Sequence, residues 1–249
     1  MCLPIFVGMA DGFLFYIRGM KNLIILHGAL GAKTQFKEIA EQLKSHFAVH
    51  SFDFDGHGAK SDASGEYSIE RFAQNLQDFM QQNEIRQPLI FGYSMGGYVA
   101  LKLESLHPQS FEKLVTLGTK FDWTPESAEK ESKMLNAEKI EEKVPAFAGY
   151  LKSLHGEDQW KKVLGETAHM MLNLGSKPAL TNGDFAKISI PVQLLRGSKD
   201  VMVSEGETST VQTQLSNADY LEIADWQHPI NLIPSRELVQ QLLSLYLPG

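Results

Sequence analysis

The sequence predicts an α/β protein built on a mostly parallel, doubly wound sheet. Apolar runs of strand length alternate with amphipathic segments over the first 120 residues and again from residue 188 onward. Connections of this length suit parallel strand pairing. The stretch 88–101 then joins a buried-strand pattern directly to the start of a helix. A chain of 249 residues is long enough to give such a domain a full core.

Each expected strand is a short apolar run that ends in turn residues. These runs cover residues 13–19, 22–28, 47–54, 88–91, 113–118, 191–197 and 218–224. Segments with a 3.6-residue hydrophobic period fall between them and are expected to be helices. Thr34, Ser68 and Ser204 are the expected N-caps of three of these helices, and Pro234 suits the first turn of the last one.

Residues 121–187 interrupt the alternation. This stretch is rich in Glu, Lys, Met and Leu, and it reads as several helices broken at Pro145, Gly156 and Gly175. We therefore expect an α/β core formed by residues 1–120 and 188–249, with a helical cap inserted at 121–187. His155 and His169 match no spacing of metal ligands, so packing and surface roles are expected for them.

Composition limits the classes of partner. The formal net charge is −7 and the sequence has no basic stripe, which argues against nucleic acid. No apolar run approaches the roughly 18 residues of a membrane span. The single cysteine, Cys2, excludes an intramolecular disulfide, and the N-terminal stretch lacks a basic leader, so a cytoplasmic location is expected. We expect a small-molecule substrate with an apolar group, no cofactor and no metal.

The pattern Gly92-x-Ser94-x-Gly96 carries the first chemical prediction. Between a strand and a helix, it is typical of a sharp turn that holds a serine hydroxyl out from the top of a sheet. Glycines are needed on both sides because larger side chains would collide with the neighbouring strand or helix. Ser94 is therefore the candidate nucleophile.

A serine hydroxyl needs an adjacent base, and the candidates follow other expected strands. Asp200 and His228 come directly after the strands at 191–197 and 218–224, in the chain order Ser, Asp, His. His228 would take the proton of Ser94, and Asp200 would hold the imidazole in the right tautomer. Asp122 is the reserve candidate for the acid.

Two backbone N–H groups are expected to stabilise an oxyanion. Met95 stands at the start of the helix after Ser94, and Ala29 lies in the turn after the strand that ends at His27. We expect structural roles for His27 and for His57, which lies in a glycine-rich turn.

These motifs resemble those of the α/β-hydrolase superfamily over nearly the whole chain outside residues 121–187. Gly92-Tyr93-Ser94-Met95-Gly96-Gly97 is similar to its nucleophile elbow, and His27-Gly28 is similar to its oxyanion turn. Arg196-Gly197-Ser198-Lys199-Asp200 and His228-Pro229 are similar to its acid and histidine segments. One departure is Asp55, where relatives usually carry proline or arginine. The resemblance implies that the insertion is a cap that shapes the substrate pocket.

The leading hypothesis is a serine hydrolase that cleaves a small or medium carboxylic ester through an acyl-serine intermediate. Leu30, Phe121, Trp123 and Met202 are the candidate pocket residues. A cofactor-free lyase or C–C bond hydrolase is the alternative, because the menaquinone-pathway lyases carry similar motifs. They typically have an arginine where this chain has Tyr98, which counts against that alternative. A non-catalytic, receptor-like binding protein is the third hypothesis.

Overall fold

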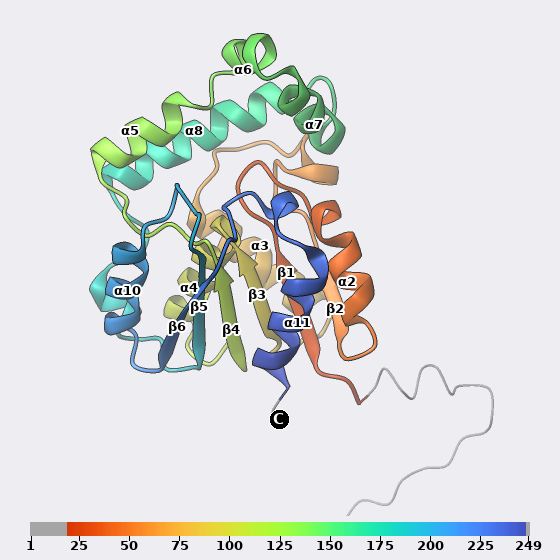
Figure 1. Ribbon diagram of the computed structural model, residues 1–249, viewed down its shortest axis with the longest axis vertical. Helices are drawn as coiled ribbons and strands as arrows, with labels where there is room; N and C mark the ends of the chain where they lie inside the picture. Colours follow the sequence, from red (N-terminus) through yellow and green to blue (C-terminus); the bar gives the residue numbers. More distant parts are fainter. Residues whose placement is uncertain (1–18, 248–249) are drawn as a thin grey trace, which may run out of the picture.

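A single parallel sheet forms the centre of the protein in the computed structural model, which describes residues 19–247 (Figure 1). Its six strands have the order β2-β1-β3-β4-β5-β6, and every neighbouring pair is parallel. The strands are β1 (Asn22–Leu26), β2 (Ala48–Ser51), β3 (Leu89–Tyr93), β4 (Lys113–Leu117), β5 (Val192–Gly197) and β6 (Ala218–Ile223). The predicted fold class is confirmed. The strand expected at 13–19, apart from Gly19, and Cys2 lie outside the described residues.

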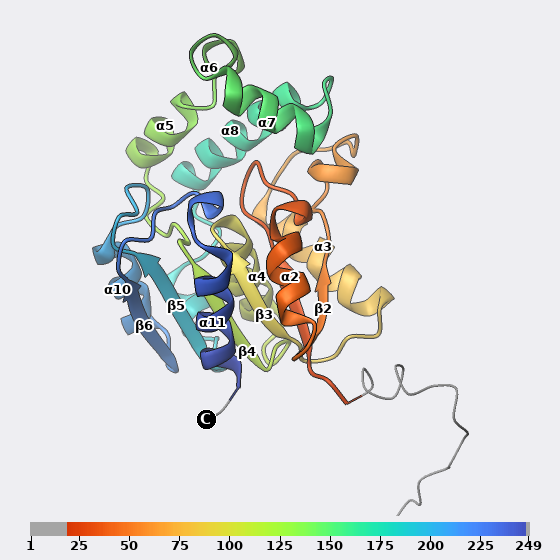
Figure 2. The same cartoon turned by 45° about the vertical axis from the view of Figure 1, so that its right-hand side comes forward.

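Helices cover both faces of this sheet. On one face lie α2 (Lys37–Leu43) and α11 (Ser235–Tyr246). On the other lie α3 (Ile69–Gln82), α4 (Met95–Leu106), α9 (Asn182–Phe185) and α10 (Glu205–Gln214) (Figure 2). Successive residues of β1 divide between the two cores: Leu23 belongs to the first and Ile24 to the second. Burial on both faces is why the strands read as continuous apolar runs.

Four helices lie above the carboxyl ends of the strands, and we call them the cap helices (Figure 1). They are α5 (Pro125–Lys133), α6 (Ala137–Lys143), α7 (Pro145–His155) and α8 (Trp160–Ser176). Pro145 begins α7 and Gly156 ends it with φ +89°, as the sequence predicts. The division of the chain into a core and a separate cap domain remains a prediction.

The helix break predicted at Gly175 falls one residue later, because α8 ends at Ser176. A Cβ at Gly175 would lie 2.4 Å from Cβ of Ala128 and 2.8 Å from the carbonyl oxygen of Thr124. The missing side chain therefore lets α8 pack closely against α5. This glycine serves a close helix–helix contact in the last turn of α8.

The predicted N-caps are confirmed in two of three cases. The backbone N–H of Arg71 donates to Ser68 Oγ at 3.2 Å, and the N–H of Glu207 donates to Ser204 Oγ at 3.2 Å. Thr34 is not a cap, because the chain first forms a 3₁₀ turn (Lys33–Phe36) and α2 begins only at Lys37. Between residues 19 and 247, no helix combines the length and the apolar character needed to cross a membrane.

Candidate active site

Ser94 stands at the sharp turn between β3 and α4. Its backbone has φ 50° and ψ −117°, an unfavourable conformation for a residue with a side chain. A Cβ at Gly92 would lie 2.6 Å from backbone atoms of Gly97, and one at Gly96 would lie 2.7 Å from the carbonyl oxygen of Leu26. Both glycines are therefore required where the turn presses against its neighbours.

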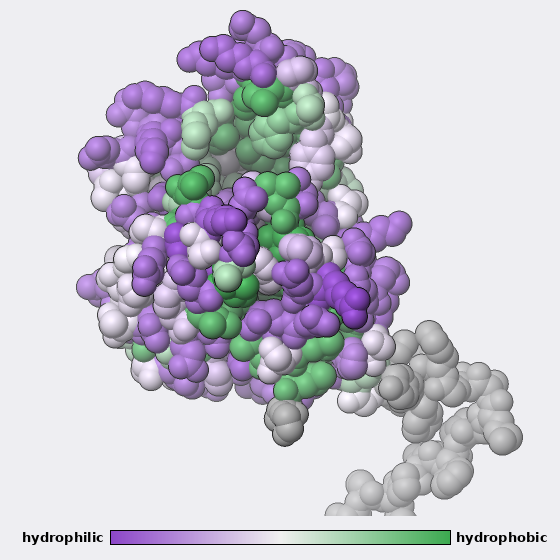
Figure 3. Space-filling view, in the orientation of Figure 1, coloured by the Kyte–Doolittle hydropathy of each residue, from purple (hydrophilic) through white to green (hydrophobic). Residues whose placement is uncertain are grey.

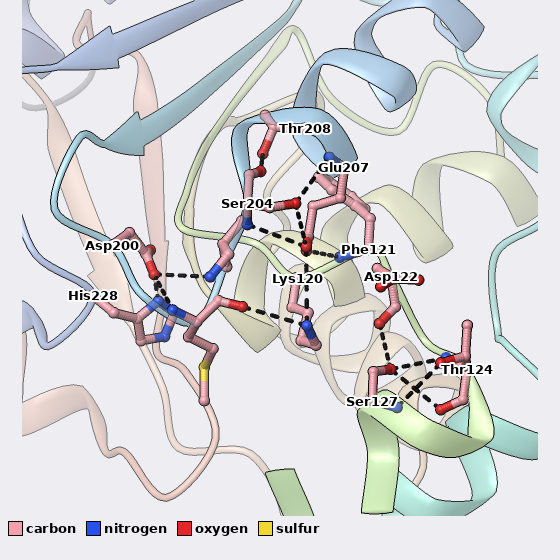
Figure 4. Close-up of polar contacts among 12 residues, drawn as sticks. Lys120, Phe121, Asp122, Thr124, Ser127, Asp200, Ser204, Glu207, Thr208 and His228 are labelled. Atoms are coloured by element: carbon pink, nitrogen blue, oxygen red, sulfur yellow. Dashed lines mark hydrogen bonds and ion pairs between the residues drawn. The ribbon is translucent and has the colours of Figure 1, made fainter. Parts of the chain in front are cut away.

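The structure brings together the three side chains that the sequence singled out, although they lie up to 134 residues apart. Ser94 Oγ lies 3.3 Å from Nε2 of His228. On the other side of the ring, His228 Nδ1 lies 2.8 Å from Oδ2 of Asp200 (Figure 4). The Tyr93 hydroxyl donates to the carbonyl oxygen of His228 at 2.8 Å, which fixes the backbone of the loop that carries the imidazole.

Asp200 is buried, and both of its carboxylate oxygens accept hydrogen bonds. Its Oδ1 accepts hydrogen bonds from the backbone N–H groups of Met202, at 2.8 Å, and Val203, at 2.9 Å. Burial alone would raise the pKa of this carboxyl, but the hydrogen bond and charge of His228 together with the two N–H groups outweigh it. The net effect lowers the pKa of Asp200, so the ionised form faces His228 Nδ1. Asp122 is exposed and makes no such contact among the described residues.

The turn after β1 packs against the serine turn. A Cβ at Gly28 would lie 2.9 Å from the Tyr93 ring and 3.1 Å from Cβ of Ser94. Leu30 follows with φ 59°, and the N–H of Gly31 closes the turn on the carbonyl oxygen of Gly28 at 3.1 Å. Ala29, between them, lines the same hollow as Ser94 and Met95. The two residues predicted to donate to an oxyanion thus line one hollow together with the serine.

Three buried histidines, His27, His57 and His155, lie near this turn. His27 donates from Nδ1 to the carbonyl oxygen of Gly28 at 2.8 Å and accepts at Nε2 from the N–H of Phe54 at 3.2 Å. His155, on α7, donates from Nε2 to the carbonyl oxygen of Leu30 at 3.0 Å. It also accepts the N–H of Gly58 at Nδ1, again at 3.0 Å. His155 therefore joins the cap helices to the turn that carries Ala29, a connection that spans 125 residues.

The neutral state of these histidines predicts acid sensitivity. Burial lowers the pKa of His27 to about 4 and also lowers the pKa values of His57 and His155. Below about pH 6.5 these histidines are protonated in the unfolded chain but stay neutral in the folded protein. The free energy of unfolding therefore decreases as the pH is lowered. We expect His27 alone to account for about 2 kcal/mol between pH 6.5 and pH 5.

Urea unfolding at several pH values between 7 and 5 measures this loss. His27→Asn should flatten the pH dependence, whereas His46→Gln, at an exposed position, should leave it as in the wild type. If the free energy of unfolding depended on pH equally in the two variants, His27 would not be the source of the acid sensitivity.

Ser94 lines two neighbouring hollows, which share Ala29, Met171 and Met202. The smaller contains Ala29 and Met95 and is mostly lined by apolar side chains, including Trp123, Met170, Met171, Leu174 and Met202. The larger contains His228 and Leu30, together with Leu135 from the connection between α5 and α6 and with Phe147 and Tyr150 of α7. Figure 3 shows hydrophobic residues gathered around a recess between the cap helices and the core.

Three of the four predicted pocket residues, Leu30, Trp123 and Met202, line these hollows. Phe121 lines a separate hollow beside α10, and its ring lies 6.2 Å from that of Tyr98. The sequence reasoning did not single out Lys120 as a lining residue or Met170 and Met171 as pocket walls. The methionines read as ordinary core positions of a helix, and no local pattern marks the face that points toward Ser94.

Asp55, the departure from the usual motif, now has a structural explanation. Its carboxylate accepts from Arg71 at 3.1 Å and from Nδ2 of Asn75 at 3.1 Å, both on α3, and lies 3.4 Å from Nζ of Lys60. Partial burial would raise its pKa, but these partners prevail and lower it. Asp55 thus ties α3 to the turn after β2 and lies away from Ser94.

Comparison with known proteins agrees with this architecture. Residues 21–137 match the family model described as "alpha/beta hydrolase fold". A pimeloyl-[acyl-carrier protein] methyl ester esterase from Klebsiella pneumoniae is 34% identical over 99 residues, which are 39% of this chain and 36% of that protein. The alignments with it and with two other curated relatives span about a third of those proteins' length.

Solved structures extend the likeness of fold to most of the chain. NosK from Streptomyces actuosus superimposes with a TM-score of 0.75 and 19% identity, covering 91% of this chain and 97% of that one. An enol-lactonase from Burkholderia xenovorans LB400 gives a TM-score of 0.71 and 17% identity, with 90% of each chain covered. The chain therefore matches the α/β-hydrolase family model over residues 21–137, and it has the α/β-hydrolase fold over most of its length.

Proposed function

We propose that the protein is a cofactor-free serine hydrolase that cleaves a small or medium carboxylic ester through an acyl-serine intermediate. The observation that carries this proposal is the continuous contact from Ser94 Oγ through His228 to Asp200, at 3.3 and 2.8 Å, beside an apolar hollow. The names of two similar proteins, a methyl ester esterase and an enol-lactonase, support ester chemistry.

In the first step His228 Nε2 takes the proton of Ser94 Oγ as the oxygen attacks the ester carbonyl. The ionised Asp200 stabilises the imidazolium that forms and keeps the proton of Nδ1 in place. The backbone N–H groups of Ala29 and Met95 stabilise the negative charge on the former carbonyl oxygen. Losing one such donor typically costs about 10²–10³ in turnover.

The leaving alcohol must receive its proton from His228 Nε2. The larger hollow contains His228, so we assign the alcohol part of the ester to it. The smaller hollow contains Met95 but not His228, and Ala29 lines both hollows, so we assign the acyl part to the smaller one. Water then enters where the alcohol left, gives its proton to His228 and attacks the acyl-serine carbonyl, releasing the acid and restoring Ser94.

Hydrolysis of p-nitrophenyl esters from acetate to octanoate tests the proposal. Because the acyl hollow is small and apolar, we expect the highest kcat/KM for short chains and a decline toward octanoate. Ser94→Ala, run beside the wild type, corrects for hydrolysis that does not depend on this site. A folded wild type with no turnover on any ester in the series would reject the proposal and favour the lyase or C–C bond alternative.

A further inference from the structure

We propose that Lys120 determines specificity by binding a carboxylate at the far end of the substrate's acyl group. The inference deepens the proposed function and rests on it, because it assigns the acyl group to the smaller hollow. With a carboxylate bound to Lys120, the expected substrate is the monoester of a short dicarboxylic acid and not a purely apolar ester.

Lys120 lies just beyond the carboxyl end of β4 and lines the hollow that contains Ser94. It is the one charged residue of this lining within the described chain; the others include Ile69, Tyr98, Met170, Met171 and Leu174. Only 10% of its side chain is exposed. A mostly buried ammonium in an apolar hollow is costly unless acceptors surround it, so its presence there calls for a partner.

The protein supplies only part of what this ammonium needs. Nζ of Lys120 donates to the carbonyl oxygen of Met202 at 3.3 Å and lies 5.8 Å from the centre of the Trp123 ring. The nearest carboxylate oxygen, Oε2 of Glu207, lies 3.9 Å away, beyond hydrogen-bond distance. An ammonium has three N–H donors, and one of them is used among residues 19–247.

Glu207 does not compete strongly for those donors, because its oxygen nearest to Nζ already accepts two hydrogen bonds. Oε1 accepts the N–H of Phe121 at 2.9 Å, while Oε2 accepts from both the N–H and the hydroxyl of Ser204 (Figure 4). These bonds hold the carboxylate at the start of α10. It therefore balances the charge of Lys120 at a distance and leaves donors for a ligand oxygen.

Tyr98, on α4, lines the same hollow but is not free to bind a substrate carboxylate. Its hydroxyl accepts the backbone N–H of Leu180 at 3.2 Å and is held there. Among the described residues that line this hollow, Lys120 is the cation that can bind an anionic acyl end. A carboxylate fits because it offers two acceptor oxygens, and its charge makes the hydrogen bonds stronger than those of a neutral acceptor.

A matched pair of substrates, methyl pentanoate and monomethyl glutarate, tests the proposal. Their hydrolysis is measured as the rate of acid release in a pH-stat. The two differ in whether the acyl chain ends in a methyl group or a carboxylate. We expect Lys120→Met to lower kcat/KM for monomethyl glutarate by about ten- to a hundredfold, mainly through KM. Methyl pentanoate should change little, and Lys120→Arg should recover most of the loss.

The exposed Lys133, on α5, provides the control variant Lys133→Met, which should leave both substrates unaffected. If Lys120→Met lowers kcat/KM equally for both esters, Lys120 only supports the loop around Met202 and the proposal is overturned. The proposal also fails if methyl pentanoate is hydrolysed with Ser94 dependence while neither substrate responds to Lys120→Met; the hydrolase function then stands.

Calorimetric binding of glutarate separates the site from the activity. We expect glutarate to bind the wild type and to lose about tenfold or more in affinity in Lys120→Met. If glutarate binds in this way but no ester is hydrolysed, the anion site stands and the proposed function fails. If glutarate does not bind and no monoester is preferred, the carboxylate assignment is wrong.

Discussion

We expect the replacement of Ser94 by alanine to lower kcat for ester hydrolysis by about 10⁴-fold or more. The reason is chemical: the variant has no atom that can attack the carbonyl, and His228 has no proton to accept from this position. A residual rate above the uncatalysed reaction remains, because the backbone N–H groups of Ala29 and Met95 and the binding hollows are intact. Alanine at φ 50° is as strained as serine, so the free energy of unfolding should barely change.

Steady-state kinetics on a short-chain p-nitrophenyl ester measures the loss, and urea unfolding confirms that the variant folds. Ser153→Ala, at an exposed position on α7, is the matched control and should retain wild-type kcat. Activity of Ser94→Ala equal to that of the wild type would reject the mechanism.

For Asp200→Asn we expect the second large effect, a drop in kcat of about 10⁴-fold with a small change in KM. Asparagine keeps the shape of the side chain, and its carbonyl oxygen can still accept the N–H groups of Met202 and Val203. Its amide, however, presents a donor where Nδ1 of His228 now faces a carboxylate. The imidazole then takes the tautomer with its proton on Nε2, which cannot accept the proton of Ser94.

The comparison with Asp122→Asn makes this result specific. Asp122 follows β4 and has the sequence features of an alternative acid, but it is exposed and does not reach His228 in the described structure. We expect Asp122→Asn to leave kcat within about twofold of the wild type. A large loss in Asp122→Asn with a small one in Asp200→Asn would reverse the assignment.

The sequence predicted the sheet and the geometry around Ser94 because both are encoded locally. Apolar runs mark the buried strands, and the glycines at 92 and 96 follow from one sharp turn. Parallel strands align their carboxyl ends, so residues that follow β3, β5 and β6 are brought to one edge whatever their separation in the chain. This is why Ser94, Asp200 and His228 could be grouped before any distance was known.

The walls of the hollows depend on long-range packing, which no local pattern encodes. Lys120 and Phe121 are neighbours in the sequence, yet they line different hollows, and a one-residue difference decides which side chain faces Ser94. The contact of His155 with Leu30 depends on how α7 lies above the sheet. The sequence places Gly175 near a helix end, but its close contact with α5 depends on how the two helices pack.

The most direct test of the account is covalent labelling by a fluorophosphonate, followed by intact mass measurement and peptide mapping. An activated serine attacks the phosphorus and keeps the phosphonyl group, so we expect one adduct per chain, on the peptide that contains Ser94. Ser94→Ala should remain unlabelled, and Asp200→Asn should label much more slowly. A folded wild type that forms no adduct, or forms it on another residue, would contradict the claim that Ser94 is the nucleophile.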